Sequence, residues 1–490
     1  MTDRKVILVG LDGATWDLIE PWADAGKLPA FSKLMQQGVW GELESTTPPI
    51  SPSAWTSIYT GVNPGKHGIT NFFKTRKNSY LYQPISSGDR KARAIWQILS
   101  DYGRKSIIIN TPFTYPPDAI AGIMITGFGT PSLRSNFVYP ERYKERLLNK
   151  FPHFAGDFGD EALILGERRK VIVKTKEIFD SQIEVATHLL NSEPYELCVV
   201  VFRAHEPLQH FFWEDKDLLL TFYQEVDSFL KYLIDDIMDE NSTLIMVSDH
   251  GFQRVESYIR VNNWLEQLGL FKINKSFKGN LAILEKLSGI IVKLGLDGLV
   301  REVFRGGLAG RIMSIIPSSS FGYLSDVDWH NTKAFYVDGS EGLIRINLKG
   351  RETQGAVDSD EYENVRELIT GELYNLADSN TKRKVISAVF RKEDIFSGEL
   401  RDVPDIVLIP ERGYCLSGQY DYSGKIFDYQ RAQERRGEHD RRGIFLSYGH
   451  EVNKGKITGA RVHDVAPTIL DMLGLPVPEF MDGRVLGILS

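Results

Sequence analysis

The sequence predicts an α/β protein whose core is an open, doubly wound, mostly parallel sheet with helices on both faces and cap-like insertions. Continuous apolar runs of the kind found in strands buried on both faces occur at residues 6–11, 106–109, 197–202, 244–247, 406–409 and 444–446. Helical patterns fall between these runs, at residues 52–60, 94–102, 161–190, 218–238 and 465–473. Strands that alternate with helices favour this class of sheet, because each helical crossover returns the chain to a parallel neighbour.

Length and composition are those of a globular protein with a large core. The chain has 490 residues, of which 42% are hydrophobic and 25% charged, and this excludes a disordered, collagen-like or coiled-coil protein. The formal net charge is -7, so the chain lacks the basic excess that favours nucleic-acid polymers as partners. Its two cysteines exclude a disulfide scaffold and an all-cysteine zinc site.

No targeting or anchoring segment is evident in the sequence. Residues 1–5 lead directly into the first apolar run, without the longer apolar region of a signal peptide. No apolar stretch reaches the roughly 18 residues that a membrane helix needs. We therefore expect a cytoplasmic protein with no membrane partner, and the sequence leaves its oligomeric state open.

Two stretches interrupt the alternation of strands and helices. The first covers residues 253–328 and includes a helical pattern at residues 281–294. The second covers residues 342–401. We interpret both as insertions into one α/β core formed by residues 1–252 and 329–490. Insertions at the carboxyl ends of strands commonly form a cap over a functional site.

Polar side chains follow the first and fourth apolar runs at the point where each run ends. Asp12 ends the first run, and Asp249 and His250 follow residues 244–247. Open α/β sheets bind ligands at the carboxyl ends of their strands, and a carboxylate with a neutral imidazole suits a cation such as zinc. We predict that these three residues form one cation site. An ordinary polar turn explains each segment when it is taken alone.

A second carboxylate and imidazole occur at a helix start after residues 197–202. Pro207 suits a first helical position, which makes Glu206 the predicted N-cap and places His210 four residues further along, on the same face. This pair suits a second cation site, and an ordinary amphipathic helix start is the alternative. His205 faces elsewhere by helical spacing, so we assign it to the surface or to the surroundings of the site.

Ser51 lies at the start of another predicted helix. Pro52 marks the first helical position, so Ser51 is the predicted N-cap. The free N–H groups at a helix N-terminus bind phosphate, and a hydroxyl beside a metal ion can ionise and attack phosphorus. The alternative is a serine that only caps its helix.

His439 lies in a charged segment before the last apolar run. Such a charge run is usually a solvated loop, and His439 gains a role only if a cation site needs a third ligand. The flanking arginines are Arg431, Arg435, Arg436, Arg441 and Arg442.

Taken together and in this order, the motifs resemble the alkaline phosphatase superfamily and, within it, the type I phosphodiesterase/nucleotide pyrophosphatase family. The resemblance extends over nearly the whole chain and implies an alkaline-phosphatase-like fold. The matching segments are the first strand with Asp12-Gly13, the segment around Ser51, residues 60–69 (TGVNPGKHGI), residues 248–252 (SDHGF), residues 344–352 and residues 463–470.

The resemblance implies a site with two divalent metal ions, usually zinc, close to each other. It also implies in-line attack of the Ser51 oxygen on phosphorus and hydrolysis of the resulting seryl-phosphate. Carried over residue by residue, the ligands of one ion are Asp12, Asp249, His250 and the oxygen of Ser51, and those of the other are Glu206, His210 and His439.

Three positions depart from the family pattern. Many relatives carry threonine in place of Ser51. Glu206 replaces an aspartate and is one methylene longer, so we expect its ion to be bound more weakly and to accept manganese as an alternative to zinc. Ala54 replaces an asparagine that contacts phosphate in nucleotide pyrophosphatases. Because Pro52 lacks an N–H, Ser53 and Ala54 are the first free helix donors expected to face the substrate.

The leading hypothesis is a metal-dependent hydrolase of phosphoric esters, a phosphodiesterase that acts on a small substrate. A phosphomonoesterase, a phosphonate hydrolase or a phosphosugar mutase on the same fold is the first alternative. A non-catalytic binding protein is the second, and the competent side chains at all the candidate metal and nucleophile positions argue against it. The sequence leaves the physiological substrate open.

Overall fold

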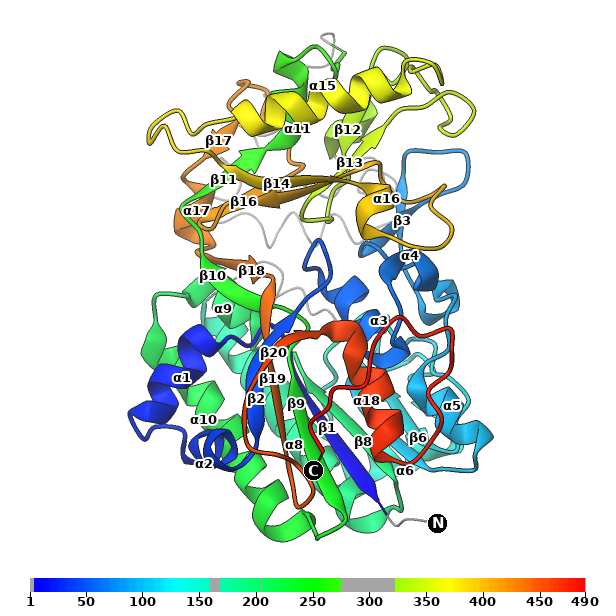
Figure 1. Cartoon of the computed structure of the whole chain (residues 1–490), viewed down its shortest axis with the longest axis vertical. Helices are drawn as coiled ribbons and strands as arrows, with labels where there is room; N and C mark the ends of the chain where they lie inside the picture. The colour runs from blue at the N-terminus through cyan, green and yellow to red at the C-terminus, as the bar shows by residue number, and fades with distance from the viewer. Residues whose placement is uncertain (1–3, 159–167, 204, 275–321, 490) are drawn as a thin grey trace, which may run out of the picture.

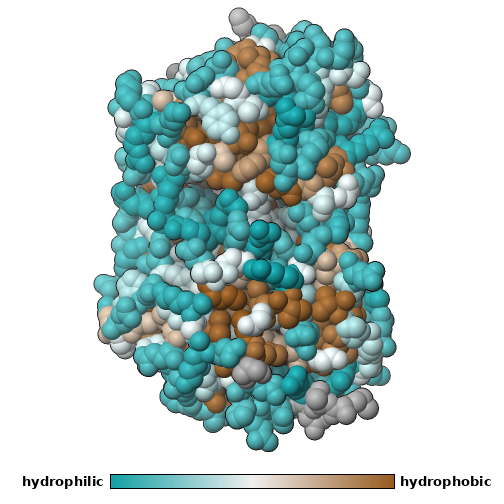
Figure 2. Space-filling model, in the orientation of Figure 1, coloured by the Kyte–Doolittle hydropathy of each residue, from teal (hydrophilic) through white to brown (hydrophobic). Residues whose placement is uncertain are grey.

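The computed structural model describes residues 4–158, 168–203, 205–274 and 322–489. The helical pattern at residues 281–294 lies outside the described residues. Figure 1 shows two stacked regions, a large α/β core and an upper region above the carboxyl ends of the central strands. On the face drawn in Figure 2, hydrophilic side chains line the band where the two regions meet, and apolar side chains gather below it. Within the described ranges, no helix combines the length and the apolar character that a membrane crossing requires.

In the part of the chain that is described, a nine-stranded sheet with the order β20-β2-β19-β9-β1-β8-β5-β6-β7 runs through the core. β1 pairs in parallel with β8 and β9, and β5 pairs in parallel with β6 and β8. β19 runs antiparallel between β9 and β2. The prediction of a mostly parallel sheet is therefore confirmed. The strands are β1 (Lys5–Leu11), β2 (Val39–Glu44), β5 (Ser106–Thr111), β6 (Gly122–Thr126), β7 (Val138–Tyr139), β8 (Leu197–Phe202), β9 (Ser242–Val247), β19 (Arg442–Gly449) and β20 (Gly455–Arg461).

Helices cover both faces of this sheet because its central strands are apolar on both sides. Ile7 and Val9 belong to the hydrophobic core of one face, and Val6 and Leu8 belong to that of the other. The helices that contribute to the first core are α1 (Trp16–Asp24), α2 (Pro29–Gln37), α6 (Arg142–Lys150), α8 (Arg168–Ser192), α9 (Glu206–Phe212) and α10 (Lys216–Tyr232). Those of the second core are α3 (Ser51–Thr60), α5 (Ile95–Asp101) and α18 (Val465–Met472).

The upper region (residues 257–274 and 322–434) has its own sheets and its own hydrophobic core. One sheet has the order β16-β11-β17, and an antiparallel sheet has the order β12-β13-β15-β14. Its elements are β11 (Ser257–Arg260), α11 (Val261–Gln267), β12 (Ala334–Tyr336), β13 (Leu343–Ile346), α15 (Tyr362–Asn375), β14 (Ile386–Arg391), α16 (Lys392–Ile395), β15 (Ile406–Pro410), β16 (Tyr414–Ser417), β17 (Phe427–Asp428) and α17 (Arg431–Glu434).

The predicted strand at residues 406–409 exists, but its placement in the main sheet is wrong. It forms part of β15, which pairs antiparallel with β13 and β14 in the upper region. An apolar run reports only that a strand is buried, and the partner strand decides which core buries it. Residues from both predicted insertions thus share one core with residues 334–336 and 406–428, which lie in the predicted α/β core.

Two short strands lie where the regions join. β10 (Gly251–Arg254) follows His250 directly and pairs antiparallel with β18 (Gly437–Asp440), with Phe252 opposite His439. The charged segment around His439 is therefore a paired strand rather than a solvated loop. Near the same junction lie α4 (Pro64–His67) and a small hairpin of β3 (Phe73–Thr75) and β4 (Tyr82–Pro84).

Two helices of the core begin one residue earlier than predicted. α3 begins at Ser51 with Ile50 as its N-cap, and α9 begins at Glu206 with His205 as its N-cap. The predictions that Ser51 and Glu206 are N-caps are therefore wrong. Proline occupies the second position of each helix, where its fixed φ is helical and its missing N–H still costs no intrahelical bond.

Candidate metal centre

Three polar side chains meet where β1 and β9 end. Asp12, Asp249 and His250 offer ligand atoms that all lie within 4.8 Å of one another, and all three residues are fully buried. β1 and β9 are parallel neighbours, which is why residues far apart in sequence converge at one edge of the sheet. We call this set the Asp12 group. The predicted convergence is found, and the role of these residues as ligands stays a prediction.

Each carboxylate of the Asp12 group has one oxygen in a hydrogen bond and one without a donor. Trp55 Nε1 donates to Asp12 Oδ2 at 2.9 Å, and the Gly13 N–H donates to Asp249 Oδ1 at 3.1 Å. Asp12 Oδ1 and Asp249 Oδ2 are buried and have no hydrogen-bond partner. A buried carboxylate oxygen without a donor is costly, and a bound cation would remove that cost.

His250 completes the Asp12 group with a lone pair. Its Nδ1 donates to the Gly251 carbonyl at 3.0 Å, so Nε2 carries the lone pair when the ring is neutral. This Nε2 lies 3.3 Å from Asp249 Oδ2 and 3.7 Å from Asp12 Oδ1. Two carboxylate oxygens and an imidazole nitrogen are a donor set that suits a divalent cation.

Burial dominates the protonation equilibria in the Asp12 group. It raises the pKa of Asp249 to about 7. Burial and, after it, the charge of Asp249 raise the pKa of Asp12 well above its usual range. Burial also lowers the pKa of His250, which keeps its imidazole neutral. Without a cation, the protein therefore resists placing two negative charges in this group.

Ser51 faces the Asp12 group from the start of α3. Its Oγ lies 3.2 Å from His250 Nε2 and its exposed fraction is 5%. The N–H groups of Ser53 and Ala54 donate to the Ile50 carbonyl at 3.1 and 3.0 Å. They are therefore not the free donors that the sequence predicted, because the helix starts at Ser51 and Ile50 accepts the bonds of its first turn.

Glu206, His210 and His439 form a second set with ligand atoms within 4.8 Å of one another, which we call the Glu206 group. α9 supplies Glu206 and His210, one turn apart, and β18 supplies His439. Glu206 Oε1 contacts His210 Nε2 and lies 3.4 Å from His439 Nε2. The rings of His439 and His250 stack with their centroids 3.7 Å apart, so the two groups are neighbours.

Two arginines, of which Arg203 is buried, lie against the Glu206 group. Arg203 Nη1 lies 3.2 Å from Glu206 Oε2, and Asp157 holds the same guanidinium through two hydrogen bonds of 2.7 Å. Arg435 Nη2 lies 2.8 Å from His210 Nε2. Burial opposes ionisation of Glu206, but attraction and hydrogen bonding from His210, with further contributions from His439 and Arg203, keep its pKa well below the usual range.

Neither Arg203 nor Arg435 is a predicted site residue. Arg203 directly follows β8, which is a signal that could have drawn attention to it. Nothing in the pattern separates Arg435 from the other arginines around His439. His205 was assigned to the surface or the surroundings of the site. It is buried, with neither ring nitrogen hydrogen-bonded, and burial lowers its pKa to about 4.

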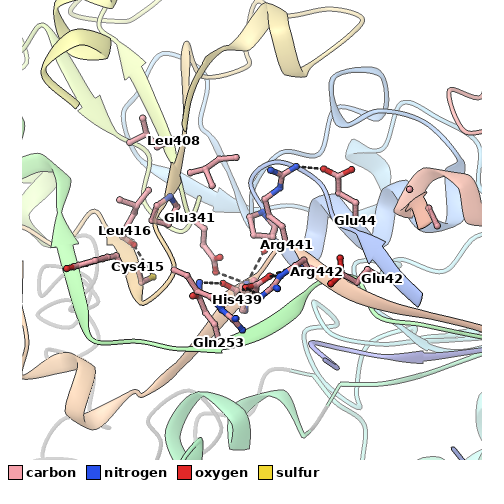
Figure 3. Close-up of a pocket in the computed structure, with 18 residues that line it drawn as sticks. Glu42, Glu44, Gln253, Glu341, Leu408, Cys415, Leu416, His439, Arg441 and Arg442 are labelled. Atoms are coloured by element: carbon pink, nitrogen blue, oxygen red, sulfur yellow. Dashed lines mark hydrogen bonds and ion pairs between the residues drawn. The ribbon is translucent and has the colours of Figure 1, made fainter. Parts of the chain in front are cut away.

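A cavity of about 420 Å³ lies between the two regions beside His439 (Figure 3). Gln253 and Arg442 line it from the core, and Glu341 and Leu416 line it from the upper region. We call it the junction cavity. Ser51 is not among its lining residues, whereas the two groups that face His439 Nδ1, Glu341 and the Pro49 carbonyl, both belong to lining residues. The junction cavity therefore reaches the outer edge of His439 rather than Ser51.

Comparison with known proteins gives a family and a fold. The family model of type I phosphodiesterase/nucleotide pyrophosphatase matches residues 6–441. No curated protein sequence matches the chain. An inactive variant of murine ectonucleotide pyrophosphatase/phosphodiesterase 5 in complex with AMP is similar in structure, with a TM-score of 0.56 and 14% identity over 99% of this chain and 100% of that one.

A second similar structure is phosphonoacetate hydrolase from Sinorhizobium meliloti 1021 in complex with phosphonoformate. Its TM-score is 0.59, with 14% identity over 96% of each chain. Identities this low establish a shared fold and leave the chemistry open. The likeness confirms the predicted alkaline-phosphatase-like fold.

Proposed function

Because the chain belongs to the type I phosphodiesterase/nucleotide pyrophosphatase family and is a hydrolase of phosphoric esters, we propose that it cleaves a small phosphodiester with Ser51 as nucleophile and two bound metal ions. One observation carries this proposal. Ser51 Oγ lies 3.2 Å from His250 Nε2, in a group with two buried carboxylate oxygens that have no donor. Such a group favours a cation, and a hydroxyl beside a cation is a competent nucleophile.

Two ligand sets would hold the ions. The Asp12 group offers two carboxylates and one imidazole, and the Glu206 group offers one carboxylate and two imidazoles. Zinc suits both sets, with manganese as an alternative at the Glu206 group. Bound divalent ions supply Lewis acidity to oxygen atoms beside them.

The chain itself supplies the nucleophile and its position. All residues of α3 are buried, so packing fixes the place of Ser51 Oγ. This oxygen forms a bond to phosphorus while the bond from phosphorus to the leaving oxygen breaks, and the proton lost by Ser51 is balanced by the proton that the leaving alkoxide takes up to become the alcohol. Water then cleaves the seryl-phosphate, which regenerates Ser51 and releases the phosphate product.

Phosphonates are the second substrate class to test, because the phosphonoacetate hydrolase shares this fold. Ala54 lacks the amide side chain that the family pattern places beside the phosphate. The buried N–H groups of Ser53 and Ala54 are already bonded to Ile50, so they do not replace it. A nucleotide pyrophosphatase activity is therefore a weaker proposal than hydrolysis of a simple diester.

A panel of chromogenic esters tests the proposal. Phosphodiester, phosphomonoester, phosphonate and sulfate esters are compared on protein loaded with zinc or manganese, and we expect the highest kcat/KM for the diester. Ser51→Ala should abolish turnover and leave the far-UV circular dichroism unchanged. Ser228→Ala, at an exposed serine of α10 whose hydroxyl donates to the Gln224 carbonyl, is the matched control.

Acid quenching during turnover should trap phosphate on the peptide that contains Ser51, as seen by mass spectrometry. Near wild-type turnover of Ser51→Ala would show that another group attacks phosphorus. Two bound ions with no turnover of any ester would favour the non-catalytic alternative.

A further inference from the structure

We propose that Glu341, which belongs to the upper region, is a positioning residue for His439 and that it sets the cation affinity of the Glu206 group. Glu341 lies in the turn between β12 and β13. The inference rests on the proposed function, in which His439 is a metal ligand. It assigns to the upper region a part in building the metal centre of the core.

The contacts of His439 fix which ring nitrogen faces the Glu206 group. Its Nδ1 lies 2.8 Å from Glu341 Oε1 and 3.1 Å from the Pro49 carbonyl oxygen (Figure 3). A carbonyl oxygen only accepts hydrogen bonds, so Nδ1 carries a proton. Nε2 points the other way and lies 3.4 Å from Glu206 Oε1. A neutral His439 therefore presents its Nε2 lone pair to the Glu206 group.

A carboxylate on the outer nitrogen of a ligating histidine has a known physical effect. It orients the ring, and its negative charge makes the inner nitrogen a stronger donor. The Pro49 carbonyl alone would hold the same tautomer, but it carries no charge. The contribution assigned to Glu341 is therefore mainly donor strength, and secondarily ring orientation.

The backbone at Glu341 gives independent support. Its φ is 55°, in the left-handed region that favours glycine and that other residues adopt at a cost. Gly339 and Gly342 in the same turn also have positive φ values, of 72° and 149°. A glycine at position 341 would adopt this φ without the cost, so the turn holds a glutamate where its backbone conformation favours glycine.

The turn that carries Glu341 is tied to the core and to its own hairpin. Asn71 Nδ2, from the core, donates to the Asp338 carbonyl at 3.0 Å, and the Leu343 N–H donates to Ser340 Oγ at 3.0 Å. Ser340, Asn71 and Asp338 are all buried. The first bond holds the turn against the core and the second lies within the hairpin, and together they position the residue that carries the Glu341 carboxylate.

Titration of the metal-free protein with Co²⁺ alone tests the inference without reference to turnover. Calorimetry and the visible absorption of bound cobalt report the affinity and the coordination of each ion. We expect Glu341→Gln to weaken the weaker-bound ion about 10-fold and Glu341→Ala to weaken it by up to about 100-fold. The ion at the Asp12 group should keep its affinity in both variants.

Two further variants separate positioning from folding. Glu341→Gly relieves the positive φ, so the unfolding midpoint of its metal-free form should not fall, while its affinity for the weaker ion should fall as in Glu341→Ala. Glu399→Gln is the matched control. Glu399 also belongs to the upper region and contacts the core, through Lys91 at 3.1 Å, but both side chains are exposed.

The outcomes are distinguishable. The inference is overturned if all three Glu341 variants bind the weaker ion as tightly as wild type does. It is also overturned if Glu399→Gln loses as much affinity for this ion as the Glu341 variants do. A wild-type protein that binds no ion at the Glu206 group overturns the proposed function instead. Selective loss of the weaker ion in the Glu341 variants, with the Glu341→Gly fold retained, supports the inference.

Discussion

The Asp12 group and the Glu206 group use the same kinds of side chain, but their charge balance differs. In the Asp12 group, two buried carboxylate oxygens have no donor. In the Glu206 group, Arg203 lies against one oxygen of Glu206, and His210 contacts the other. Arg435 Nη2 lies 2.8 Å from the nitrogen of His210 that contacts Glu206. The first group is therefore short of positive charge, and the second already contains it.

This difference indicates unequal affinities for cations. A cation at the Asp12 group removes the cost of two unpaired carboxylate oxygens. A cation at the Glu206 group has to separate Glu206 from His210 and displace Arg435 from His210 Nε2. We therefore expect the ion at the Glu206 group to be the weaker-bound of the two. The extra methylene of Glu206 leads to the same expectation, and the structure adds competing internal partners.

Asp249→Asn should lower activity strongly and should have the opposite effect on the stability of the fold. Without the ion of the Asp12 group, kcat/KM should fall by about 10³-fold or more, because metal assistance contributes several kcal/mol to the barrier. The metal-free variant should be more stable than metal-free wild type, since a costly buried charge is gone. Ester hydrolysis and urea unfolding measure the two effects. A lower free energy of unfolding for the metal-free variant than for metal-free wild type would contradict the charge imbalance.

The stability difference between metal-free Asp249→Asn and metal-free wild type should change with pH in a defined direction. Native Asp249 has a pKa of about 7, whereas the unfolded chain has the ordinary value of about 3.9. The native state of metal-free wild type therefore holds the extra proton between these values, and its stability falls as the pH rises through this window. Asparagine does not titrate. The advantage of Asp249→Asn should thus grow from about pH 4 to pH 7 and then level off.

Arg203→Met tests whether buried ion pairs hold the Glu206 group together. The substitution leaves Asp157, whose side chain is fully buried, without its guanidinium partner. We expect a loss of about 3–5 kcal/mol in the free energy of unfolding, measured by urea denaturation. Arg254→Met is the control, because the pair of Arg254 with Glu214 is exposed and should contribute at most about 1 kcal/mol. An equal loss in the free energy of unfolding for Arg203→Met and Arg254→Met would refute the role given to the buried ion pairs.

Glu206→Gln addresses the weaker ion directly. We expect its affinity to fall by about 10- to 100-fold, with the ion of the Asp12 group retained, since only one ligand set loses a negative charge. Anomalous diffraction at each site after metal titration measures the two occupancies. Equal loss at both sites, or no loss, would mean that Glu206 is not a ligand, and His205 would then be the residue to examine.

Ser51→Ala should have the smallest effect on stability. Ser51 is the first residue of α3 rather than its N-cap, and the hydrogen bond of its hydroxyl is to His250 Nε2. We expect a change of about 1 kcal/mol or less in the free energy of unfolding. Urea denaturation of metal-free protein measures it. A cost of several kcal/mol would indicate that Ser51 supports the fold of the Asp12 group.

The sequence by itself determined the parts of the protein that depend on local patterns. Apolar runs marked the central strands, and the residues at their ends included Asp12, Asp249 and His250, which the structure brings together. This was predictable because parallel neighbours present their carboxyl ends at one edge. The motifs also indicated the family, which the family model confirms over residues 6–441.

Tertiary structure alone decided which distant segments meet. It placed β15 in the upper region, paired β18 with β10, and brought Glu341 to His439. It also surrounded the Glu206 group with guanidinium groups that no sequence pattern distinguished. The physical reason is that hydrophobic periodicity is a local property of a chain, whereas strand partners and buried charge pairs depend on the packing of residues far apart in sequence.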